Sequence, residues 1–262
     1  MAGLGIVAGA GPLPRLVAQA ATSRGRRVFT LGLDGITDRS TTADRSVPLG
    51  SLGAALTALR EARLDEVVLA GPVPRPRLTD LRPDLRAARL MARLMLGRIG
   101  DDAALRAVIA AIEEEGMRVI GADAAAPELL APAGALGKTA PMASAFGELP
   151  AGIAGCRELG DAGQAVVVQG GAVIGREGRD GTDALLAGSG GCPGGILVKL
   201  PKPHQDRRVD LPTIGPRTVE LAAAAGLRGL FVEAGGTLVV DRPATVAAAD
   251  RAGLFVFGIV PG

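Results

Sequence analysis

The sequence predicts an α/β fold with a parallel sheet in its first half, followed by a second domain of mixed α/β structure. Two features of the chain favour this class. In the first half, short apolar runs that end near glycine alternate with stretches of helical spacing, which is the pattern of parallel βαβ units. In the second half, strand-like and helix-like stretches also alternate, but more glycine joins them. With 262 residues, the chain can form one large domain or two of about 100–150 residues each.

The elements of the first half follow in order. Apolar runs predict strands at 4–8, 27–31, 66–70 and 118–121, and helical spacing predicts helices at 15–23, 52–63, 84–99 and 103–115. Asp101 and Asp102 precede the last of these helices as caps. Residues 122–135 are rich in Ala and Pro, which is typical of a linker or a loose crossover. We therefore place an N-terminal domain at 1–133 and a C-terminal domain at 134–262.

The second half alternates between strand-like and helix-like stretches without an internal repeat. Strands are predicted at 165–169, 195–200, 230–232, 238–240 and 254–260, and helices at 182–187, 215–225 and 244–252. This succession predicts a second α/β domain, in which glycine-rich joints separate the elements.

Composition and charge exclude several classes of function. The chain has five Phe but neither Tyr nor Trp, and its net charge is +2. It therefore offers few aromatic faces for base stacking and no broad positive field, so nucleic acid is not an expected partner. Its two cysteines, Cys156 and Cys192, and its single histidine, His204, show neither disulfide nor zinc spacing. We expect carboxylates to carry the chemistry.

The first residues of the chain do not favour export. The sequence Val-Ala-Gln-Ala at 17–20 is similar to a signal-peptide cleavage site. However, no Lys or Arg precedes the apolar stretch, and glycine and proline interrupt it. The chain also lacks an apolar run of about 18 residues, the length that a membrane-spanning helix needs. We therefore expect a cytoplasmic protein.

The segment Gly9-Ala-Gly-Pro-Leu-Pro14 lies between the first strand and the first helix. At such a turn, backbone N–H groups and the helix dipole favour a phosphate, and glycine permits close approach of the backbone. Gly9, Gly11 and Pro12 are therefore candidate substrate-binding residues. The motif lacks the third glycine of a dinucleotide fingerprint and the Gly-Lys-Ser/Thr of a Walker loop. A tight turn without a ligand is the alternative.

The segment 198–215 carries the largest group of polar side chains, and three prolines restrict its backbone. Lys202 and Arg208 can stabilise negative charge, and Asp210 can bind Mg²⁺ or activate water. Cleavage of a phosphoric anhydride requires these kinds of group. The other candidates for substrate contact are Gln205 and Thr213, and Thr213 is predicted to cap the helix that follows. A solvated charged loop is the alternative.

Further acidic residues could complete a metal site around Asp210. The candidates are Asp183 and Glu233, with Asp180 and Asp241 in addition. Mg²⁺ commonly takes one or two carboxylates together with phosphate oxygens and waters, so not all of these can be ligands. Asp183 could instead cap a helix, and Asp241 could lie in a turn.

Several motifs in addition to the glycine turn belong together. They are Ala70-Gly-Pro-Val-Pro-Arg-Pro76, Leu81-Arg-Pro-Asp84, Gly100-Asp-Asp-Ala103, Gly137-Lys-Thr-Ala-Pro141, Gly181-Thr-Asp183, Lys202-Pro-His-Gln-Asp206, Arg208-Val-Asp-Leu-Pro-Thr-Ile-Gly215 and Glu233-Ala-Gly235. With these motifs the chain resembles, almost from end to end, the I-type UDP-2,3-diacylglucosamine pyrophosphatases of lipid A biosynthesis. The string at 208–215 is the most specific of them. The chain departs from the family at 187–195, which is short and glycine-rich, and at Asp180, where glutamate is expected.

The resemblance implies a Mg²⁺-dependent hydrolase that converts UDP-2,3-diacylglucosamine to UMP and 2,3-diacylglucosamine 1-phosphate (lipid X). It also implies a Rossmann-like nucleotide-binding domain, followed by a catalytic and lipid-binding α/β domain. The family's essential aspartate falls on Asp210, and Lys138 joins the candidate substrate ligands.

A lipid-modified UDP-sugar would require apolar walls. The basic helix predicted at 85–99 could make peripheral contact with the inner membrane surface, although such a stripe more often packs on a core. A homodimer is left open.

Two other functions compete with the hydrolase. A nicotinamide-dependent oxidoreductase would use the first βαβ unit and needs an acid near the end of the second strand, for which Asp34 is a weak candidate. A non-catalytic nucleotide-sugar binding protein would bind the ligand and leave it intact.

Overall fold

The computed structural model describes residues 3–73, 84, 101–160, 162–190, 193–202, 206–208 and 210–261, without the side chains of 101–104. The helix predicted at 84–99, apart from Asp84, lies outside the described residues, as do Cys192, His204 and Gln205. The chain divides into two compact units. The first comprises residues 1–126 and 207–209, and the second comprises residues 127–206 and 210–262.

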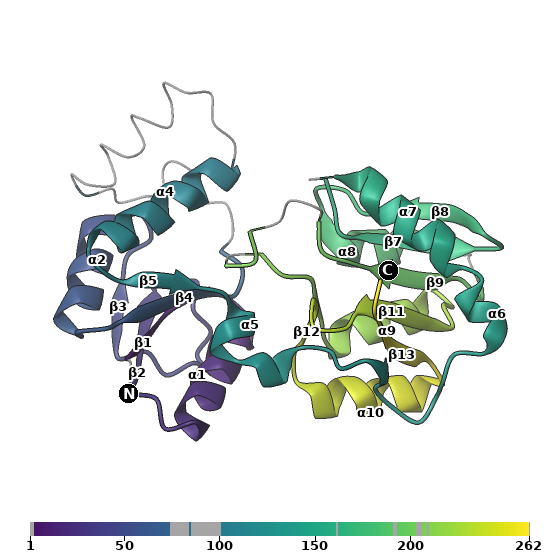
Figure 1. Ribbon diagram of the computed structural model, residues 1–262, viewed down its shortest axis with the longest axis horizontal. Coiled ribbons are helices and arrows are strands. Elements are labelled where there is room, and N and C mark those ends of the chain that lie inside the picture. Colours follow the sequence, from purple (N-terminus) through teal and green to yellow (C-terminus); the bar gives the residue numbers. More distant parts are fainter. Residues whose placement is uncertain are drawn as a thin grey trace. The chain divides into compact units, whose positions relative to one another are not determined.

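The first unit is built on a five-stranded parallel sheet (Figure 1). In sheet order, its strands are β3 (Arg45–Val47), β2 (Val28–Leu33), β1 (Leu4–Ala8), β4 (Glu66–Ala70) and β5 (Arg118–Ile120). Helices α1 (Leu13–Ser23) and α5 (Ala122–Ala125) cover one face, and α2 (Leu52–Glu61) and α4 (Asp101–Glu114) cover the other. The parallel α/β sheet predicted for the first half is confirmed.

Burial explains why most of these strands could be recognised in the sequence. Because helices cover both faces of the sheet, the strands are almost continuously apolar. Leu31, Leu59 and Ile112 are buried together on the face that α2 and α4 cover. Strand β3 was not predicted, because two of its three residues are exposed and it lacks an apolar run.

The second unit is built on a six-stranded mixed sheet. In sheet order, its strands are β6 (Gly134–Ala135), β13 (Phe255–Ile259), β11 (Gly229–Glu233), β9 (Ile196–Lys199), β7 (Ala165–Gln169) and β8 (Ala172–Arg176). The three central strands β13, β11 and β9 are parallel, whereas β6, β7 and β8 each pair antiparallel with a neighbour. A separate parallel pair joins β10 (Thr213–Ile214) to β12 (Leu238–Val239).

The helices of the second unit lie on both sides of this sheet (Figure 1). They are the 3₁₀ turn η2 (Pro127–Leu129), α6 (Ala143–Phe146), α7 (Leu149–Leu159), α8 (Gly181–Gly188), α9 (Pro216–Ala224) and α10 (Arg242–Ala252). The mixed α/β structure predicted for the second half is therefore confirmed. Among the described residues, no helix combines the length and the apolar character that crossing a membrane requires.

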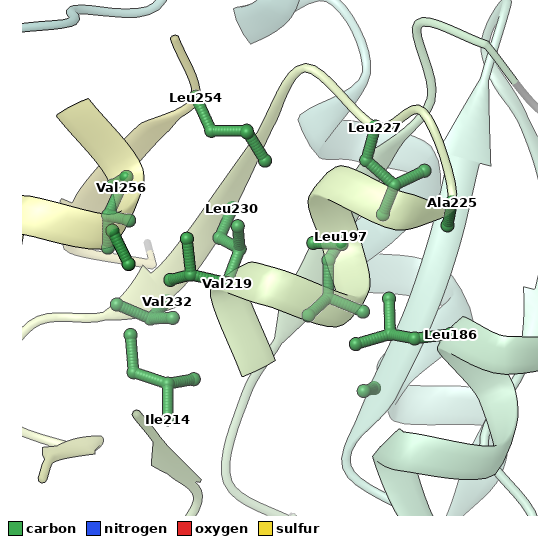
Figure 2. Close-up of a cluster of buried hydrophobic side chains, with 14 of the residues drawn as sticks. Leu186, Leu197, Ile214, Val219, Ala225, Leu227, Leu230, Val232, Leu254 and Val256 are labelled. Atoms are coloured by element: carbon green, nitrogen blue, oxygen red, sulfur yellow. The ribbon is translucent and has the colours of Figure 1, made fainter. Parts of the chain in front are cut away.

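Two apolar cores enclose the mixed sheet. On one face, Leu197 and Leu230 pack with Leu186 of α8 and Val219 of α9 (Figure 2). The neighbouring Phe231 belongs to the core on the opposite face, because successive side chains of a strand alternate between faces. These strands are therefore apolar up to their last residues, Lys199 of β9 and Glu233 of β11.

The sequence missed four elements of the second unit, which are α6, α7, β8 and β10, and it assigned no element to the stretch 122–135. Residues 122–135 were predicted as a linker, but they contain α5, η2 and β6. Strand β8 was missed because it is an edge strand with exposed positions. Helix α7 was missed because Gly152, Gly155 and Pro150 are poor helix formers. Its glycines have a packing role, since a Cβ at Gly152 would lie 2.5 Å from Val198 Cγ2 and 3.0 Å from Val198 Cβ.

The close approach of α7 to β9 gives the first testable prediction. Gly152→Ala should lower the free energy of unfolding by about 1–3 kcal/mol, because Val198 cannot move its Cβ away from the added methyl group. Gly188→Ala in α8 is the matched control, because a Cβ there meets open space. The control should be neutral or stabilising by up to about 1 kcal/mol. Urea unfolding of both variants tests this, and equal effects would contradict it.

Candidate active site

One edge of the mixed sheet collects polar side chains from four separate segments. Because β9 and β11 are parallel, their carboxyl ends, Lys199 and Glu233, meet at the same edge. Strand β7 runs antiparallel to β9, so its first residue, Ala165, pairs with Lys199. The residue before it, Gln164, therefore lies at this edge. Asp210 lies there too, because it contacts Gln164.

The centre of the edge is a buried chain of hydrogen bonds. The Lys199 ammonium group donates to Thr182 Oγ1 at 2.6 Å, and the Thr182 hydroxyl donates to Glu177 Oε1 at 2.7 Å. The other carboxylate oxygen of Glu177, Oε2, accepts the backbone N–H of Gln164 at 2.6 Å. Lys199, Thr182 and Glu177 are all buried. Each of these polar groups thus has a partner that offsets the cost of its burial.

Electrostatics at Lys199 reflect this burial. Burial lowers the pKa of the Lys199 ammonium group, whereas the carboxylates of Glu177, Asp210 and Asp183 act in the opposite direction. Burial and the surrounding acids thus act in opposite directions on the pKa of Lys199, and burial is the larger influence.

Asp210 lies at the exposed end of the hydrogen-bonded group that includes Lys199, Glu177 and Gln164. Its Oδ2 accepts a hydrogen bond from Gln164 Nε2 at 3.1 Å and lies 3.5 Å from Lys202 Nζ. The Asp210 side chain is 48% exposed. The structure thus brings together the predicted catalytic residues Asp210 and Lys202, with the carboxylate held on one side and open to solvent on another.

Asp183 follows Thr182, a member of the buried chain of hydrogen bonds. It occupies the first turn of α8, where a carboxylate complements the helix dipole, and its Oδ2 accepts from Arg217 Nε at 2.6 Å. The residue at the N-cap position is Asp180. The motif Gly181-Thr-Asp183 therefore supplies one buried and one exposed group to the same region.

Glu233 lines a small pocket of about 130 Å³ in the second unit. The other lining residues are Ile153, Cys156, Arg157, Leu200, Pro201 and Pro261. Burial raises the pKa of the Cys156 thiol to about 12, and the thiol donates to the backbone oxygen of Val198 at 3.4 Å. Cys156 is therefore a packed neutral thiol, not an activated nucleophile.

Thr213 is not the helix cap that the sequence suggested. It lies in β10, and its hydroxyl donates to the backbone oxygen of Leu211 at 3.1 Å. Helix α9 begins at Pro216 with Gly215 as the N-cap residue, whose N–H donates to Thr218 Oγ1 at 3.3 Å. The cap prediction was wrong because a two-residue strand precedes the helix.

Backbone N–H groups at the glycine turn of the first unit are bonded to carbonyl oxygens of the same chain. The N–H groups of Gly9 and Ala10 donate to the backbone oxygens of Ala70 and Pro72, each at 2.8 Å. A Cβ at Gly9 would overlap the carbonyl group of Gly71. The absence of a side chain at Gly9 thus serves packing against the end of β4. Gly11, by contrast, has open space around its Cα.

Two other predicted residues, Arg208 and Lys138, each bond an acidic residue of their own unit. Arg208 belongs to the first unit, where its Nη1 is 3.2 Å from Glu113 Oε1. In the second unit, the backbone N–H of Lys138 donates to Asp250 near the end of α10. Because β6 runs antiparallel to β13, the backbone of Lys138 lies at the opposite edge of the mixed sheet from Lys199 and Glu233.

The donors at the polar edge are compatible with Mg²⁺. Within the described ranges, no three His, Cys, Asp or Glu side chains gather as a metal site, so Asp210, Asp183 and Glu233 do not form such a cluster. However, Asp210 and Asp183 are half-exposed carboxylates, and Mg²⁺ commonly uses only one or two of these beside phosphate oxygens and waters. Mg²⁺ binding thus stays a prediction.

Sequence reasoning missed Gln164, Glu177 and Thr182 as parts of the site, and it did not select Lys199. The last of these had a signal, because it is the only charged residue of the run Gly195–Leu200, which was predicted as a buried strand. Thr182 belongs to the motif Gly181-Thr-Asp183, whereas Gln164 and Glu177 have no local signal, since their place at this edge depends on the antiparallel pairing of β7 with β8 and β9.

The fold and this edge define a two-unit α/β protein whose second unit carries an enzyme-like array of ammonium, carboxylate and amide groups. Family models agree with both units. The model described as the LpxI N-terminal domain matches residues 3–129, and the LpxI C-terminal domain matches residues 132–257. The chain is also 41% identical, over 98% of its own length and 98% of the relative's, to the UDP-2,3-diacylglucosamine pyrophosphatase LpxI of Caulobacter vibrioides. The chain belongs to the LpxI family, and the resemblance found in its motifs is confirmed.

The buried thiol gives the second prediction. At pH 8 a thiol with a pKa of about 12 has roughly a thousandth of the thiolate of an ordinary cysteine. Iodoacetamide should therefore modify Cys156 about a thousandfold more slowly in the folded protein than in urea. Peptide mass spectrometry can follow Cys156 separately from Cys192. Similar rates in the folded and the unfolded protein would contradict the burial of this thiol.

Proposed function

We propose that the chain is a Mg²⁺-dependent hydrolase that cleaves the pyrophosphate of UDP-2,3-diacylglucosamine in lipid A biosynthesis, releasing UMP and 2,3-diacylglucosamine 1-phosphate. One observation carries the proposal: Gln164 and Lys202 hold the half-exposed carboxylate of Asp210 at the sheet edge. Membership of the LpxI family supports the choice of substrate, since the Caulobacter vibrioides relative is named a UDP-2,3-diacylglucosamine pyrophosphatase.

Hydrolysis of the diphosphate adds water to one phosphorus, breaks the P–O–P bond and releases two phosphate monoesters and a proton. Lys202 supplies positive charge where phosphate oxygens gain negative charge in the transition state. Asp210 either accepts a proton from the attacking water or provides an oxygen ligand for the metal. When bound, Mg²⁺ supplies Lewis-acid chemistry and offsets the negative charge of the diphosphate.

The remaining predicted contacts belong to the same proposal. Gly9, Gly11 and Pro12 would contact a phosphate or the ribose of the nucleotide, and the open space at Gly11 suits such a contact. The other predicted residues are Arg208 as a catalytic cation, and Lys138, Gln205 and Thr213 as substrate ligands. A cytoplasmic location with peripheral contact to the inner membrane surface would bring the enzyme to its lipid substrate.

The hydrolase is favoured over the two alternatives. The dinucleotide fingerprint of an oxidoreductase is incomplete, because no third glycine follows Gly9 and Gly11 at the required spacing. A non-catalytic binding protein would not need a half-exposed carboxylate beside a lysine and an amide. A direct assay separates all three functions.

The third prediction is the reaction itself. Incubation of the protein with UDP-2,3-diacylglucosamine and Mg²⁺ should release UMP, which chromatography detects. EDTA should abolish the release and added Mg²⁺ should restore it, because the metal offsets the charge of the diphosphate. Intact substrate after prolonged incubation would contradict the proposed hydrolase activity. Release of UMP that persists in EDTA would contradict the proposed requirement for Mg²⁺.

The fourth prediction concerns Asp210. Asp210→Ala should lower kcat by about 10²–10⁴-fold, the usual contribution of a positioned acid–base group. The fold should be retained, because this side chain is half exposed. Glu158→Ala is a matched control in the same unit, where the carboxylate is 64% exposed and pairs with Arg176. The control should keep wild-type kcat. Similar rates in Asp210→Ala and wild type would place the chemistry elsewhere.

A further inference from the structure

Gln164 joins a buried cluster to the carboxylate that carries the proposed function. Its backbone N–H donates to Glu177 at 2.6 Å, and its side-chain amide donates to Asp210 Oδ2 at 3.1 Å. The amide nitrogen is thus nearer to Asp210 than the Lys202 ammonium nitrogen, which lies at 3.5 Å. Gln164 therefore gives this carboxylate an amide donor and has a fixed backbone.

The backbone of Gln164 is fixed from both sides. Its carbonyl oxygen accepts the N–H of Leu200 at 2.9 Å, next to the end of β9. Glu177, which holds its N–H, is only 9% exposed and is itself held by the Thr182 hydroxyl. Thr182 is in turn bonded to Lys199, which is 7% exposed. Displacement of any member would leave a buried polar group without a partner.

We infer that Gln164 is a positioning residue for Asp210, and that the buried cluster of Lys199, Thr182 and Glu177 fixes where Gln164 stands. This inference rests on the proposed function and deepens it. The amide fixes the orientation of the half-exposed carboxylate before the substrate binds. An error of about 1 Å in such a group lowers the rate about a hundredfold. The cluster thus acts on the reaction through Gln164 and Asp210.

The variant Gln164→Met isolates this effect. Methionine has a similar length but lacks the amide donor, and the backbone bonds of residue 164 to Glu177 and Leu200 remain. At saturating Mg²⁺, kcat should fall about 10–100-fold, whereas KM should stay within about threefold, because the loss is confined to the transition state. The thermal midpoint should change by no more than about 2 °C. A purely structural role would lower the midpoint and leave kcat of the folded fraction unchanged.

A pair of variants at Thr182 tests the buried cluster. Thr182→Ser keeps the hydroxyl that links Lys199 to Glu177, and it should retain kcat within about threefold. Thr182→Val has nearly the same shape without the hydroxyl, and it should lower kcat to a similar degree as Gln164→Met. If Thr182→Val does not fold, the Gln164→Met result still decides the role of the amide.

Crystal structures of wild type and Gln164→Met separate this inference from the proposed function. A reoriented Asp210 carboxylate together with lower kcat supports the inference. An unchanged carboxylate orientation, or an unchanged kcat in an active enzyme, overturns it. If the wild type releases no UMP but the carboxylate reorients in Gln164→Met, the proposed function fails and the positioning of Asp210 by Gln164 stands.

Discussion

The burial of the Lys199 ammonium group constrains the whole polar edge. An unpaired charge inside a protein costs several kcal/mol, so the lysine is tolerated only with acceptors and opposite charge close by. Thr182 and Glu177 meet this need, and their positions fix the start of α8 and the segment after β8. The same carboxylate then fixes the start of β7 through Gln164. The buried Lys199 thus links the end of β9 to the segment from Glu177 to Thr182 and, through Glu177, to the start of β7.

The direction of β7 decides at which edge of the sheet Gln164 lies. In a fully parallel sheet, the residue before β7 would lie at the edge where β9 begins, far from Lys199. Because β7 runs antiparallel to β9, Gln164 lies beside the carboxyl end of β9 and reaches Asp210. The change from parallel to antiparallel pairing within one sheet therefore creates the polar edge. The hairpin β7–β8 also returns the chain to this edge at Glu177.

The sequence predicted the parts of the fold and the site that local chemistry determines. Buried strands are apolar at most positions on both faces, so β1, β4 and β11 could be recognised. Lys202 and Asp210 could be grouped because prolines restrict the sequence between them. Helix α7 could not be recognised, because its glycines serve close packing, Gly152 against Val198 and Gly155 against Val173. Likewise, the contact of Gln164 with Asp210 depends on a strand order that no local pattern contains. The prediction missed features that depend on which strands pair, because residues far apart in the sequence decide that pairing.

The two motifs that looked most functional in the sequence turn out to differ physically. At the glycine turn, the small size of Gly9 is used for packing against Gly71, and two N–H groups are satisfied by the chain. A glycine in such a position would be required even in a protein without a ligand. At the polar edge, by contrast, Asp210 is held by polar partners while half of its surface stays open. Packing alone does not require such an arrangement, but electrostatic catalysis does, since it depends on groups that are already oriented when charge develops. The second unit therefore carries the groups that are suited to chemistry.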